Sequence, residues 1–466
     1  MSDKQKLENE KNSDMSLDIP YPTEELMTVK SYRKSYRILK LVGILQLLSI
    51  LYLFLTWAYI DMKNSPSAHR NRTKKYPIMV WHTNDLWWAR CNRKVLCTDH
   101  FGKIECDVIL QEYHPEDVDA YLFYSGYVKT FPLPRHPKTL WAVMLDESPI
   151  NRLQFMYEKA LNLFNVSASF SRYSDVPMPL IWLSGYDELV ASTYYVNTSM
   201  KNALLSKLKI APVLYIQSNC DTATERDVYV KEIMKYIEVD SYGACLNNKN
   251  LPLQVEFNHL NGTDGYLSLL FDSEIFKFIA RYKFMIAIEN AVCNDYMSEK
   301  LWRVIEAGVV PIYYGSPLIR DWLPNNKSAI LLEDFPTPEL LSQHLHYLLN
   351  NDTAYEEYLE HKIHKRVTNQ KLINELTARP HEVDLSGVVE ELECLVCSKL
   401  HRNMSNVNMV TKKHYDCPIP TSALTLSVNP KNGWIKRLTE DKERVEQLYQ
   451  EIGQSDLTPR ESRTSW

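Results

Sequence analysis

This chain has few glycines and no excess of positive charge, and each of these features argues against a class of protein. Only 12 of the 466 residues are glycine, which argues against repeat and low-complexity architectures. The formal net charge is −5, so we do not expect nucleic acid as the main partner, because phosphate binding requires a basic surface. The length is sufficient for two domains of ordinary size.

A long run without any charged residue lies near the amino terminus. Residues 41–60 carry no charge, and as a helix they would span roughly 30 Å, the thickness of a bilayer core. Cations gather just before this run, at Lys30, Arg33, Lys34, Arg37 and Lys40. The positive-inside rule then puts the amino terminus in the cytosol and the rest of the chain in a lumen. A buried core helix is the alternative.

We therefore predict a single-pass type II membrane protein of the secretory pathway, in the Golgi stack or the endoplasmic reticulum. Residues 1–40 form a cytosolic tail, residues 41–60 a transmembrane signal-anchor helix and residues 61–76 a stem. Seven N-x-S/T sequons follow the anchor as N-glycosylation candidates. They lie at Asn71, Asn165, Asn197, Asn261, Asn326, Asn351 and Asn403.

All nine cysteines also follow the anchor. An oxidising lumen would pair most of them and leave at least one odd thiol or an intermolecular bridge. Cys394 and Cys397 form a C-x-x-C motif without a second such motif elsewhere. This favours a structural disulfide at Cys394 and Cys397, with half of a zinc site or a redox pair as alternatives.

The most informative stretch runs from residue 284 to residue 315. Its first five residues, Phe284–Ile288, form a short apolar run typical of a buried strand. A helical period follows, capped by Asp295 or Ser298 and stopped at Gly308. Residues 309–314 read as a second buried strand, so the stretch predicts a right-handed parallel strand-helix-strand unit.

Glu299 and Lys300 fall in the first turn of that predicted helix. A lysine there opposes the helix dipole, because cations prefer the other end. An anionic ligand would remove the conflict, and a solvated charge pair is the alternative. A sugar-nucleotide diphosphate fits such a site, with Lys300 on the phosphates and Glu299 accepting from the ribose hydroxyls.

This stretch resembles the signature of the alpha-1,3-fucosyltransferases, glycosyltransferase family ten. The matching residues are Phe284, Glu289, Asn290, Tyr296, Glu299, Lys300, Gly308, Pro311 and Gly315. The resemblance covers roughly residues 77–400 and is nearest to the divergent fucosyltransferase ten and eleven branch, which looks like protein O-fucosyltransferases. Ile288 and Ala291 depart from the wider family pattern, in which an aromatic residue and a serine stand there.

The resemblance implies an α/β fold of the GT-B arrangement, with two Rossmann-like domains that face a cleft. Strands read at residues 78–81, 121–124 and 140–145 agree with a doubly wound first domain. We predict an acceptor-side domain over residues 77–210 and a GDP-fucose-binding domain over residues 211–380. Residues 381–466 would form a cysteine-containing extension and a polar tail.

The resemblance also assigns site residues. Glu147 follows the strand at 140–145 and matches the family's proposed general base, with Asp146 beside it. Arg226, near a helix start, matches the arginine that holds the donor diphosphate, and Asn290 and Tyr296 would help to seat the nucleotide. The implied activity is inverting transfer of L-fucose from GDP-fucose to a glycoprotein hydroxyl, without an essential metal or other cofactor.

Two acceptors agree with the resemblance. One is serine or threonine of a cysteine-rich (EMI-type) domain, and the other is N-acetylglucosamine of a glycan, fucosylated at the alpha-1,3 position. Two other functions remain as alternatives. A metal-dependent glycosyltransferase would use the D-x-D pair Asp117 and Asp119, and a non-catalytic luminal protein would bind the sugar nucleotide without turnover.

Overall fold

The computed structural model describes residues 76–82, 92–111, 117–125, 128, 130–251, 272–402 and 408–454. Residues 74–466 form one compact unit. The predicted cytosolic tail, the anchor helix at 41–60 and nearly all of the stem lie outside the described residues, as do Cys91, Asn71, Asn261 and Asn403. Among the residues that are described, no helix is both long enough and apolar enough to cross a membrane.

The first of two sheets has the strand order β2-β3-β1-β4-β5-β6-β7. β2 is antiparallel to β3, and every other neighbouring pair is parallel. Its strands are β1 (Ile78–Trp81), β2 (Arg93–Cys97), β3 (Ile104–Leu110), β4 (Ala120–Tyr124), β5 (Leu140–Leu145), β6 (Val166–Ser169) and β7 (Val176–Pro177). The strands predicted at residues 78–81, 121–124 and 140–145 are confirmed as β1, β4 and β5.

The second sheet is parallel throughout and has the order β12-β11-β10-β8-β9. Its strands are β8 (Val213–Ile216), β9 (Val239–Tyr242), β10 (Phe284–Ile288), β11 (Val310–Tyr314) and β12 (Ile330–Leu331). Read from β9, the chain order is 2-1-3-4-5, so the winding direction reverses between β8 and β10. In such doubly wound sheets, ligands bind beyond the carboxyl ends of the strands at this reversal.

The predicted strand-helix-strand unit is confirmed as β10, α8 (Glu299–Glu306) and β11. Ser298 is the helix cap, and its hydroxyl accepts a hydrogen bond from the Lys300 amide. Gly308 ends the turn after α8 with a φ of +67°, and a Cβ at this position would lie 2.5 Å from the Tyr195 ring. A positive φ and this close contact both explain why glycine occupies the position.

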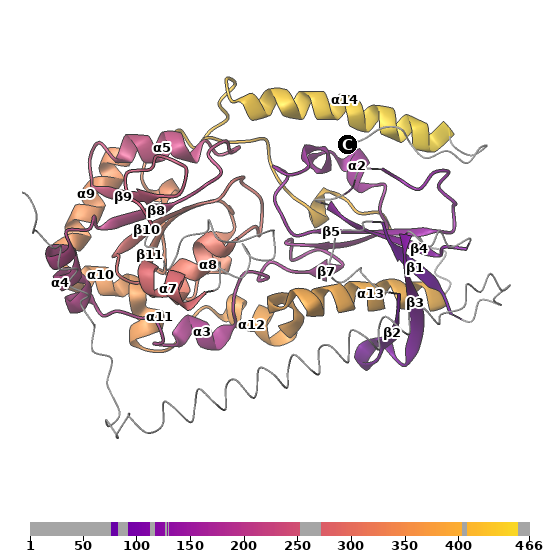
Figure 1. The fold of residues 1–466 in the computed structure, drawn as a ribbon, viewed down its shortest axis with the longest axis horizontal. Coiled ribbons are helices and arrows are strands. Elements are labelled where there is room, and N and C mark those ends of the chain that lie inside the picture. Colours follow the sequence, from indigo (N-terminus) through magenta and orange to yellow (C-terminus); the bar gives the residue numbers. More distant parts are fainter. Residues whose placement is uncertain are drawn as a thin grey trace, which may run out of the picture. The chain divides into compact units, whose positions relative to one another are not determined.

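Helices cover the faces of both sheets (Figure 1). The longer ones are α4 (Thr198–Leu208), α5 (Arg226–Ile233), α7 (Ser273–Ile279), α9 (Pro338–Leu349), α12 (Gln370–Ala378), α13 (Leu385–His401) and α14 (Gly433–Gln454). The shorter ones are α2 (Glu158–Leu161), α3 (Tyr186–Val190), α10 (Asp352–Glu356) and α11 (Glu360–Ile363). Short 3-10 turns join several of them, of which η5 (Leu153–Met156) concerns the site.

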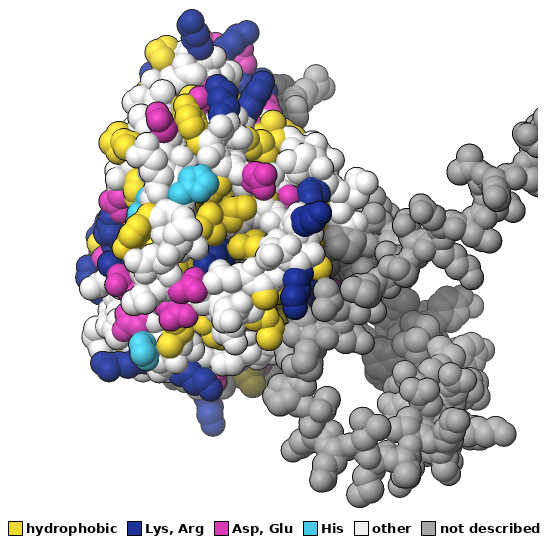
Figure 2. All heavy atoms as spheres, turned by 90° about the vertical axis from the view of Figure 1, so that its left-hand side faces the viewer, with side chains coloured by type: hydrophobic (Ala, Val, Ile, Leu, Met, Phe, Trp, Pro, Cys, Tyr) yellow, Lys and Arg dark blue, Asp and Glu magenta, His cyan; other side chains and the backbone are white. Residues whose placement is uncertain are grey.

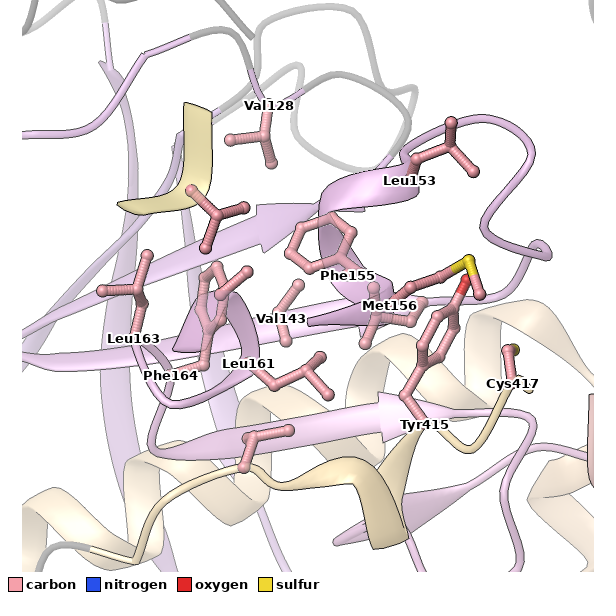
Figure 3. Packing of buried hydrophobic residues seen from close by; sticks show 14 of the residues in the cluster. Val128, Val143, Leu153, Phe155, Met156, Leu161, Leu163, Phe164, Tyr415 and Cys417 are labelled. Atoms are coloured by element: carbon pink, nitrogen blue, oxygen red, sulfur yellow. The ribbon is translucent and has the colours of Figure 1, made fainter. Parts of the chain in front are cut away.

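β5 shows how the first sheet separates two cores. Trp141, Val143 and Leu145 pack on the face covered by α2, η5 and α14. Ala142 and Met144 pack on the opposite face, against α13. This alternation follows from the two-residue period of a strand that is buried on both sides. Figure 3 shows the first of these cores, in which Tyr415 and Cys417 from the end of the chain lie beside Met156.

The carboxyl-terminal segment, residues 408–454, is part of this core, although the end of the chain was expected to form only a polar tail. Trp434, Leu438, Val445 and Leu448 of α14 are buried in the core. They recur at intervals of three, four and seven residues, so they share one face of the helix. Most exposed positions of α14 are charged or polar, and the number of such residues in the composition conceals this narrow apolar stripe.

Four disulfides join the described cysteines, as Cys97–Cys394, Cys106–Cys397, Cys220–Cys245 and Cys293–Cys417. Cys394 and Cys397 are therefore both bridged, as predicted, but not to each other. One helical turn of α13 points both thiols at the hairpin of β2 and β3, where Cys97 and Cys106 receive them. The zinc and redox alternatives for this motif are wrong, since neither sulfur is free.

The predicted sequons differ in accessibility. Asn197 and Asn326 are exposed, and Asn351 is partly exposed as the cap of α10. Asn165 is 4% exposed, and its amide contacts Arg135, the Trp141 amide and the Asn408 carbonyl. A glycan on Asn165 is incompatible with this packing, so that candidate is corrected.

Charges of both signs are interspersed on the face that carries α4, without a broad patch of one sign (Figure 2). Nucleic-acid binding would require a basic stripe or patch. The coloured side chains of this one face form no such stripe or patch (Figure 2).

Candidate active site

Glu147 lies just beyond the carboxyl end of β5. The Tyr296 hydroxyl donates a hydrogen bond of 3.0 Å to its carboxylate. The Tyr415 hydroxyl donates a hydrogen bond of 2.7 Å to its backbone carbonyl. Both tyrosine rings are buried against Phe170, with centroids 5.0 and 4.9 Å away. The base predicted from sequence is thus held by residues about 150 and 270 positions away.

The surroundings favour the neutral form of Glu147. Burial and the neighbouring Asp146 carboxylate raise the pKa of Glu147 to about 7, against the opposing effects of Lys300 and the Tyr296 hydrogen bond. Burial also raises the pKa of Asp146, whose carboxylate accepts a hydrogen bond of 2.6 Å from Tyr124. A carboxyl whose pKa lies near neutrality is suited to exchange a proton with a substrate.

A pocket of about 360 Å³ lies at the reversal between β8 and β10. We call it the switch-point pocket, and it is lined by Gln217, Ser218, Asn219, Arg226, Asn290, Glu299 and Lys300. Residues 217–219 follow β8 and Asn290 follows β10, whereas Glu299 and Lys300 are the first two residues of α8. Its volume lies within the range of small-molecule sites, roughly 300–1,000 Å³.

Lys300 lies at the centre of a charge network in this pocket. Its ammonium is 3.0 Å from a Glu299 carboxylate oxygen and 3.8 Å from a Glu289 oxygen. Although burial opposes it, the two carboxylates raise the pKa of Lys300. Although burial opposes it too, Lys300 and Arg303 lower the pKa of Glu299. Both groups are therefore ionised at neutral pH.

The network corrects the argument from the helix dipole. Glu289 is completely buried and accepts hydrogen bonds of 2.7 Å from both the Ser298 amide and the Ser298 hydroxyl. A carboxylate thus already occupies the amino end of α8, where the dipole favours an anion. The position of Lys300 does not by itself require an external anion. The alternative of a solvated charge pair is also wrong, because the Lys300 and Glu299 side chains are each only 12% exposed.

Two buried polar atoms at the pocket wall have no hydrogen-bond partner among the described residues. They are Nε of Arg226 and Oδ1 of Asn290. The terminal nitrogens of Arg226 donate to the carbonyls of Asn219 and Ile288, which fixes the guanidinium between the loops after β8 and β10. A buried donor and a buried acceptor left unpaired at one wall indicate that a polar ligand completes the site.

Tyr296 occupies a different place from the one predicted. Its ring is 1% exposed and does not line the switch-point pocket, and its hydroxyl binds Glu147. Tyr296 therefore contacts the predicted base and is not placed to contact a nucleotide in the switch-point pocket. Glu147, Glu299 and Lys300 are near enough that both charges of α8 influence the Glu147 carboxyl. The structure thus brings the base and the pocket together.

Arg172 holds the loop between β10 and α8, which contains Tyr296. It follows β6 of the first sheet, and its guanidinium donates hydrogen bonds to both oxygens of Asp295 and to one oxygen of Asp321. The guanidinium also lies 4.6 Å from the centre of the Trp322 ring. Asp295 is 1% exposed with a φ of +62°, so this buried ion pair fixes the turn that presents Tyr296.

Asp117 and Asp119 lie away from this site. The two aspartates precede β4, whereas Glu147 follows its parallel neighbour β5. The aspartates therefore lie at the amino ends of the strands and Glu147 lies at the carboxyl ends. An Asp119 carboxylate oxygen accepts a hydrogen bond of 2.7 Å from the Ile78 amide, which is a structural role. Their position counts against the metal-dependent alternative, because a metal there would be remote from Glu147.

Several residues of the site were not predicted. Tyr415 lies in the extension predicted over residues 381–466, in which no catalytic or donor-binding residue was predicted. The loop after β8, whose residues 217–219 line the switch-point pocket, was not predicted to belong to the site either. That loop closes against β9 because Gly243, at a φ of +87°, lies so near that a Cβ would be 2.4 Å from the Gln217 carbonyl oxygen.

Comparison with known proteins gives a family. A model described as "Glycosyltransferase family 10 (fucosyltransferase) C-term" matches residues 206–414, and "Fucosyltransferase, N-terminal" matches residues 73–181. The human GDP-fucose protein O-fucosyltransferase 3 is 38% identical over 371 residues, covering 75% of this chain and 74% of that protein. The Alpha-(1,3)-fucosyltransferase B of Drosophila melanogaster is 37% identical over 352 residues, covering 73% and 76%.

A crystal structure of an alpha1,3-fucosyltransferase with GDP aligns with a TM-score of 0.41 and 16% identity, over 76% of this chain and 96% of that one. This likeness is too distant to add to the assignment. The sequence relatives are similar over about three quarters of their length, and the two family models cover both sheets. By these family models and relatives, the chain belongs to glycosyltransferase family 10, the fucosyltransferases.

Proposed function

We propose that this protein transfers L-fucose from GDP-fucose to a hydroxyl of a glycoprotein acceptor with inversion, and that its two sheets form a GT-B arrangement. The observation that carries the proposal is the hydrogen bond from Tyr296 to Glu147. It joins the carboxyl at the end of the first sheet to the loop that leads into α8, where the switch-point pocket begins. The base and the donor site are thereby in one place.

The donor would occupy the switch-point pocket. Lys300 and Arg226 supply positive charge at the β8–β10 reversal, where the diphosphate of a nucleotide would lie. Glu299 accepts hydrogen bonds from ribose hydroxyls, and Asn290 contributes an unpaired acceptor at the same wall. As the bond between fucose and phosphate breaks, GDP leaves with the electron pair. The two cations stabilise the negative charge that develops on it.

Glu147 takes the proton from the acceptor hydroxyl as its oxygen forms the new bond to the anomeric carbon. Attack from the face opposite the leaving GDP inverts the configuration at that carbon, and the positive charge on the sugar ring develops as in glycoside hydrolysis. Because cationic side chains take the electrostatic role that a metal has in D-x-D enzymes, we propose that no divalent metal is essential.

The test is transfer by the full chain with GDP-fucose and EDTA, to a folded EMI-type domain or to a glycoprotein with N-glycans ending in N-acetylglucosamine. We expect transfer with EDTA present. The Glu147→Gln variant should lose about 10²- to 10⁴-fold in rate, while its affinity for GDP, measured by calorimetry, stays within a few-fold. The non-catalytic alternative predicts no transfer by the wild type, and the metal-dependent alternative predicts that EDTA abolishes it.

Asp146→Asn is the matched control, because it makes the same change in the adjacent carboxyl. Asp146 is bound to Tyr124 and raises the pKa of Glu147. We expect this variant to retain most of its activity and to become active at lower pH. If Asp146→Asn loses as much activity as Glu147→Gln, the assignment of the base to Glu147 is wrong.

We also propose that residues 41–60 anchor the protein in a membrane of the secretory pathway, with the described residues in the lumen. The uncharged run and the preceding cations support this topology. In sealed microsomes, residues 74–466 should resist added protease, and epitopes in residues 1–40 should be cleaved. The reverse pattern would contradict the proposal.

A further inference from the structure

Glu147 is held at two of its groups by two different segments of the chain. The Tyr296 hydroxyl binds its carboxylate, and the Tyr415 hydroxyl binds its backbone carbonyl. Tyr296 belongs to the loop between β10 and α8, whereas Tyr415 follows α13 and precedes α14. Because the carbonyl and the carboxylate belong to one residue, the separation of the two hydroxyls restricts the conformation of the Glu147 side chain.

A disulfide joins these two segments close to both tyrosines. Its cysteines are Cys293, three residues before Tyr296, and Cys417, two residues after Tyr415. Both cysteines are buried, at 0% and 3% exposed, in the core that also contains the two tyrosines and Phe170. Figure 3 shows Cys417 next to Tyr415 in this core. The bridge therefore lies within a few residues of each hydroxyl that holds the base.

Hydrogen bonds link the same two segments beside the bridge. The backbone amide of Asn294 donates to the Asp416 carbonyl at 2.9 Å, and its side-chain amide donates to the Asp416 carboxylate at 2.6 Å. We call residues 293–296 and 415–417 together the base clasp. Its contacts form a closed ring, which runs from the carboxylate of Glu147 through both arms and the bridge to the carbonyl of the same residue.

Each arm of the base clasp also has its own anchor on the first sheet. Arg172 pairs with Asp295 in one arm. In the other arm, the hydroxyls of Ser169 and Ser171 donate to backbone carbonyls just before Tyr415. Since a disulfide has a specific geometry and permits less movement than these contacts, the bridge restricts the separation of the two arms most tightly. Removing it should therefore loosen the base while the anchors keep the site assembled.

We propose that the Cys293–Cys417 disulfide is a positioning group for fucose transfer, which holds the Glu147 carboxylate at the place where it meets the acceptor hydroxyl. This inference rests on the proposed role of Glu147 as the base. A misplacement of about 1 Å can lower a rate about 10²-fold, so a loosened base is costly even in a folded protein. Neither cysteine lines the switch-point pocket, so the bridge should affect kcat more than the binding of the donor.

The test is the full chain with Cys293→Ser and Cys417→Ser together, given GDP-fucose and the acceptor that the wild type fucosylates, an EMI-type domain or the glycan-bearing glycoprotein. We expect kcat to fall about tenfold, because the anchors remain, and the affinity for GDP to stay within a few-fold. The acidic limb of the pH profile of kcat/KM should move to higher pH, because a loosened Tyr296 stabilises the carboxylate less.

This pH measurement isolates Tyr296 from the other groups that act on Glu147. The variant leaves Asp146, Glu299 and Lys300 unchanged, which are the charged groups that influence the Glu147 carboxyl. A bridge that only stabilises the fold would lower the melting temperature. It would leave kcat and the acidic limb as in the wild type, at a temperature where circular dichroism shows the variant to be folded.

Cys97→Ser with Cys394→Ser is the matched control, because it removes another buried bridge, on the opposite face of the first sheet. We expect it to leave kcat and the acidic limb unchanged. Asn294→Ala is the milder variant, which keeps the bridge and removes one hydrogen bond across the base clasp. It should move the acidic limb in the same direction by a smaller amount, and it decides the question if the variant without the bridge does not fold.

A double-mutant cycle then asks whether the bridge acts through Tyr296. We expect Tyr296→Phe to move the acidic limb less in the variant without the bridge than in the wild type. Equal movement in both backgrounds overturns the inference, as does an equal loss of kcat in the two bridge variants. If Glu147→Gln is inactive but the variant without Cys293–Cys417 behaves as the wild type, only the base clasp is wrong. If Glu147→Gln keeps full activity, the proposed base itself is wrong.

Discussion

The hydrogen bond between Tyr296 and Glu147 makes a quantitative prediction about pH dependence. In Tyr296→Phe the carboxylate of Glu147 loses a donor at 3.0 Å. A hydrogen bond to a charged group contributes about 1.5–3 kcal/mol, and the neutral acid keeps a weaker form of it. A differential of about 1.4 kcal/mol corresponds to one pKa unit. The pKa of Glu147, raised to about 7 by its surroundings, should therefore rise further by about one unit.

The base must be ionised, so this increase removes activity on the acidic side only. We expect kcat/KM for GDP-fucose, which reports the free enzyme, to fall about eightfold at pH 6.5 and to be roughly unchanged at pH 9. The assay is a pH series of initial rates of GDP release with GDP-fucose and acceptor both well below their KM, so that the rates report the free enzyme.

Tyr415→Phe is the control for this experiment. Tyr415 is also buried against Phe170, and its hydroxyl also binds Glu147, but at the backbone carbonyl. It should reduce stability without moving the acidic limb. If the limb stays in place in Tyr296→Phe, or moves equally in both variants, then Tyr296 does not control the ionisation of the base.

Three further predictions concern the charge network, the ion pair and the disulfides. Lys300→Met should lower kcat/KM for GDP-fucose by about 10²- to 10³-fold and weaken GDP binding in calorimetry, with partial rescue in Lys300→Arg; a loss below fivefold would contradict a role on the phosphates. Arg172→Ala leaves the buried Asp295 without its cation, so the free energy of unfolding in urea should fall by about 3–5 kcal/mol, whereas Arg320→Ala, which removes an exposed pair with Asp334, should change it by less than about 1 kcal/mol. The paired change Cys97→Ser with Cys394→Ser should lower the free energy of unfolding by about 3 kcal/mol. Cys106–Cys397 still closes the long loop in this variant, so the change opens only a ring of about a dozen residues. A loss as large as that from removing both bridges would refute this reasoning.

The sequence predicted those parts of the fold that depend on local patterns. β1 and β5 follow from short apolar runs, and the β10–α8–β11 unit follows from two such runs, a capping serine and a stopping glycine within about thirty residues. Local pattern also located Glu147, because a polar residue directly after a buried strand must lie at the edge of a sheet. The family resemblance then supplied its role, which local pattern cannot.

The remaining features depend on contacts between distant parts of the chain. The partners of Cys394 and Cys397 are more than 290 residues away, and the C-x-x-C spacing carries no information about them. The dipole argument for Lys300 failed because Glu289, eleven positions earlier, folds back onto the amino end of α8. The α14 stripe was missed because the four buried apolar residues that form it are outnumbered by charges in a helix of 22 residues.

The carboxyl-terminal segment also determines when the enzyme becomes complete during synthesis. Residues 408–454 contact loops of both sheets, through Val410 to Phe164, through Cys417 to Cys293 and through Ala423 to Thr224. Because the ribosome adds these residues after both sheets, a nascent chain that ends before residue 408 lacks Tyr415 beside Glu147 and α14 over the first core. Such a chain has every predicted catalytic residue and still an unfinished site. We therefore expect fucose transfer to begin only after residues 408–454 have been synthesised, and a stop codon before residue 415 to lower the activity strongly.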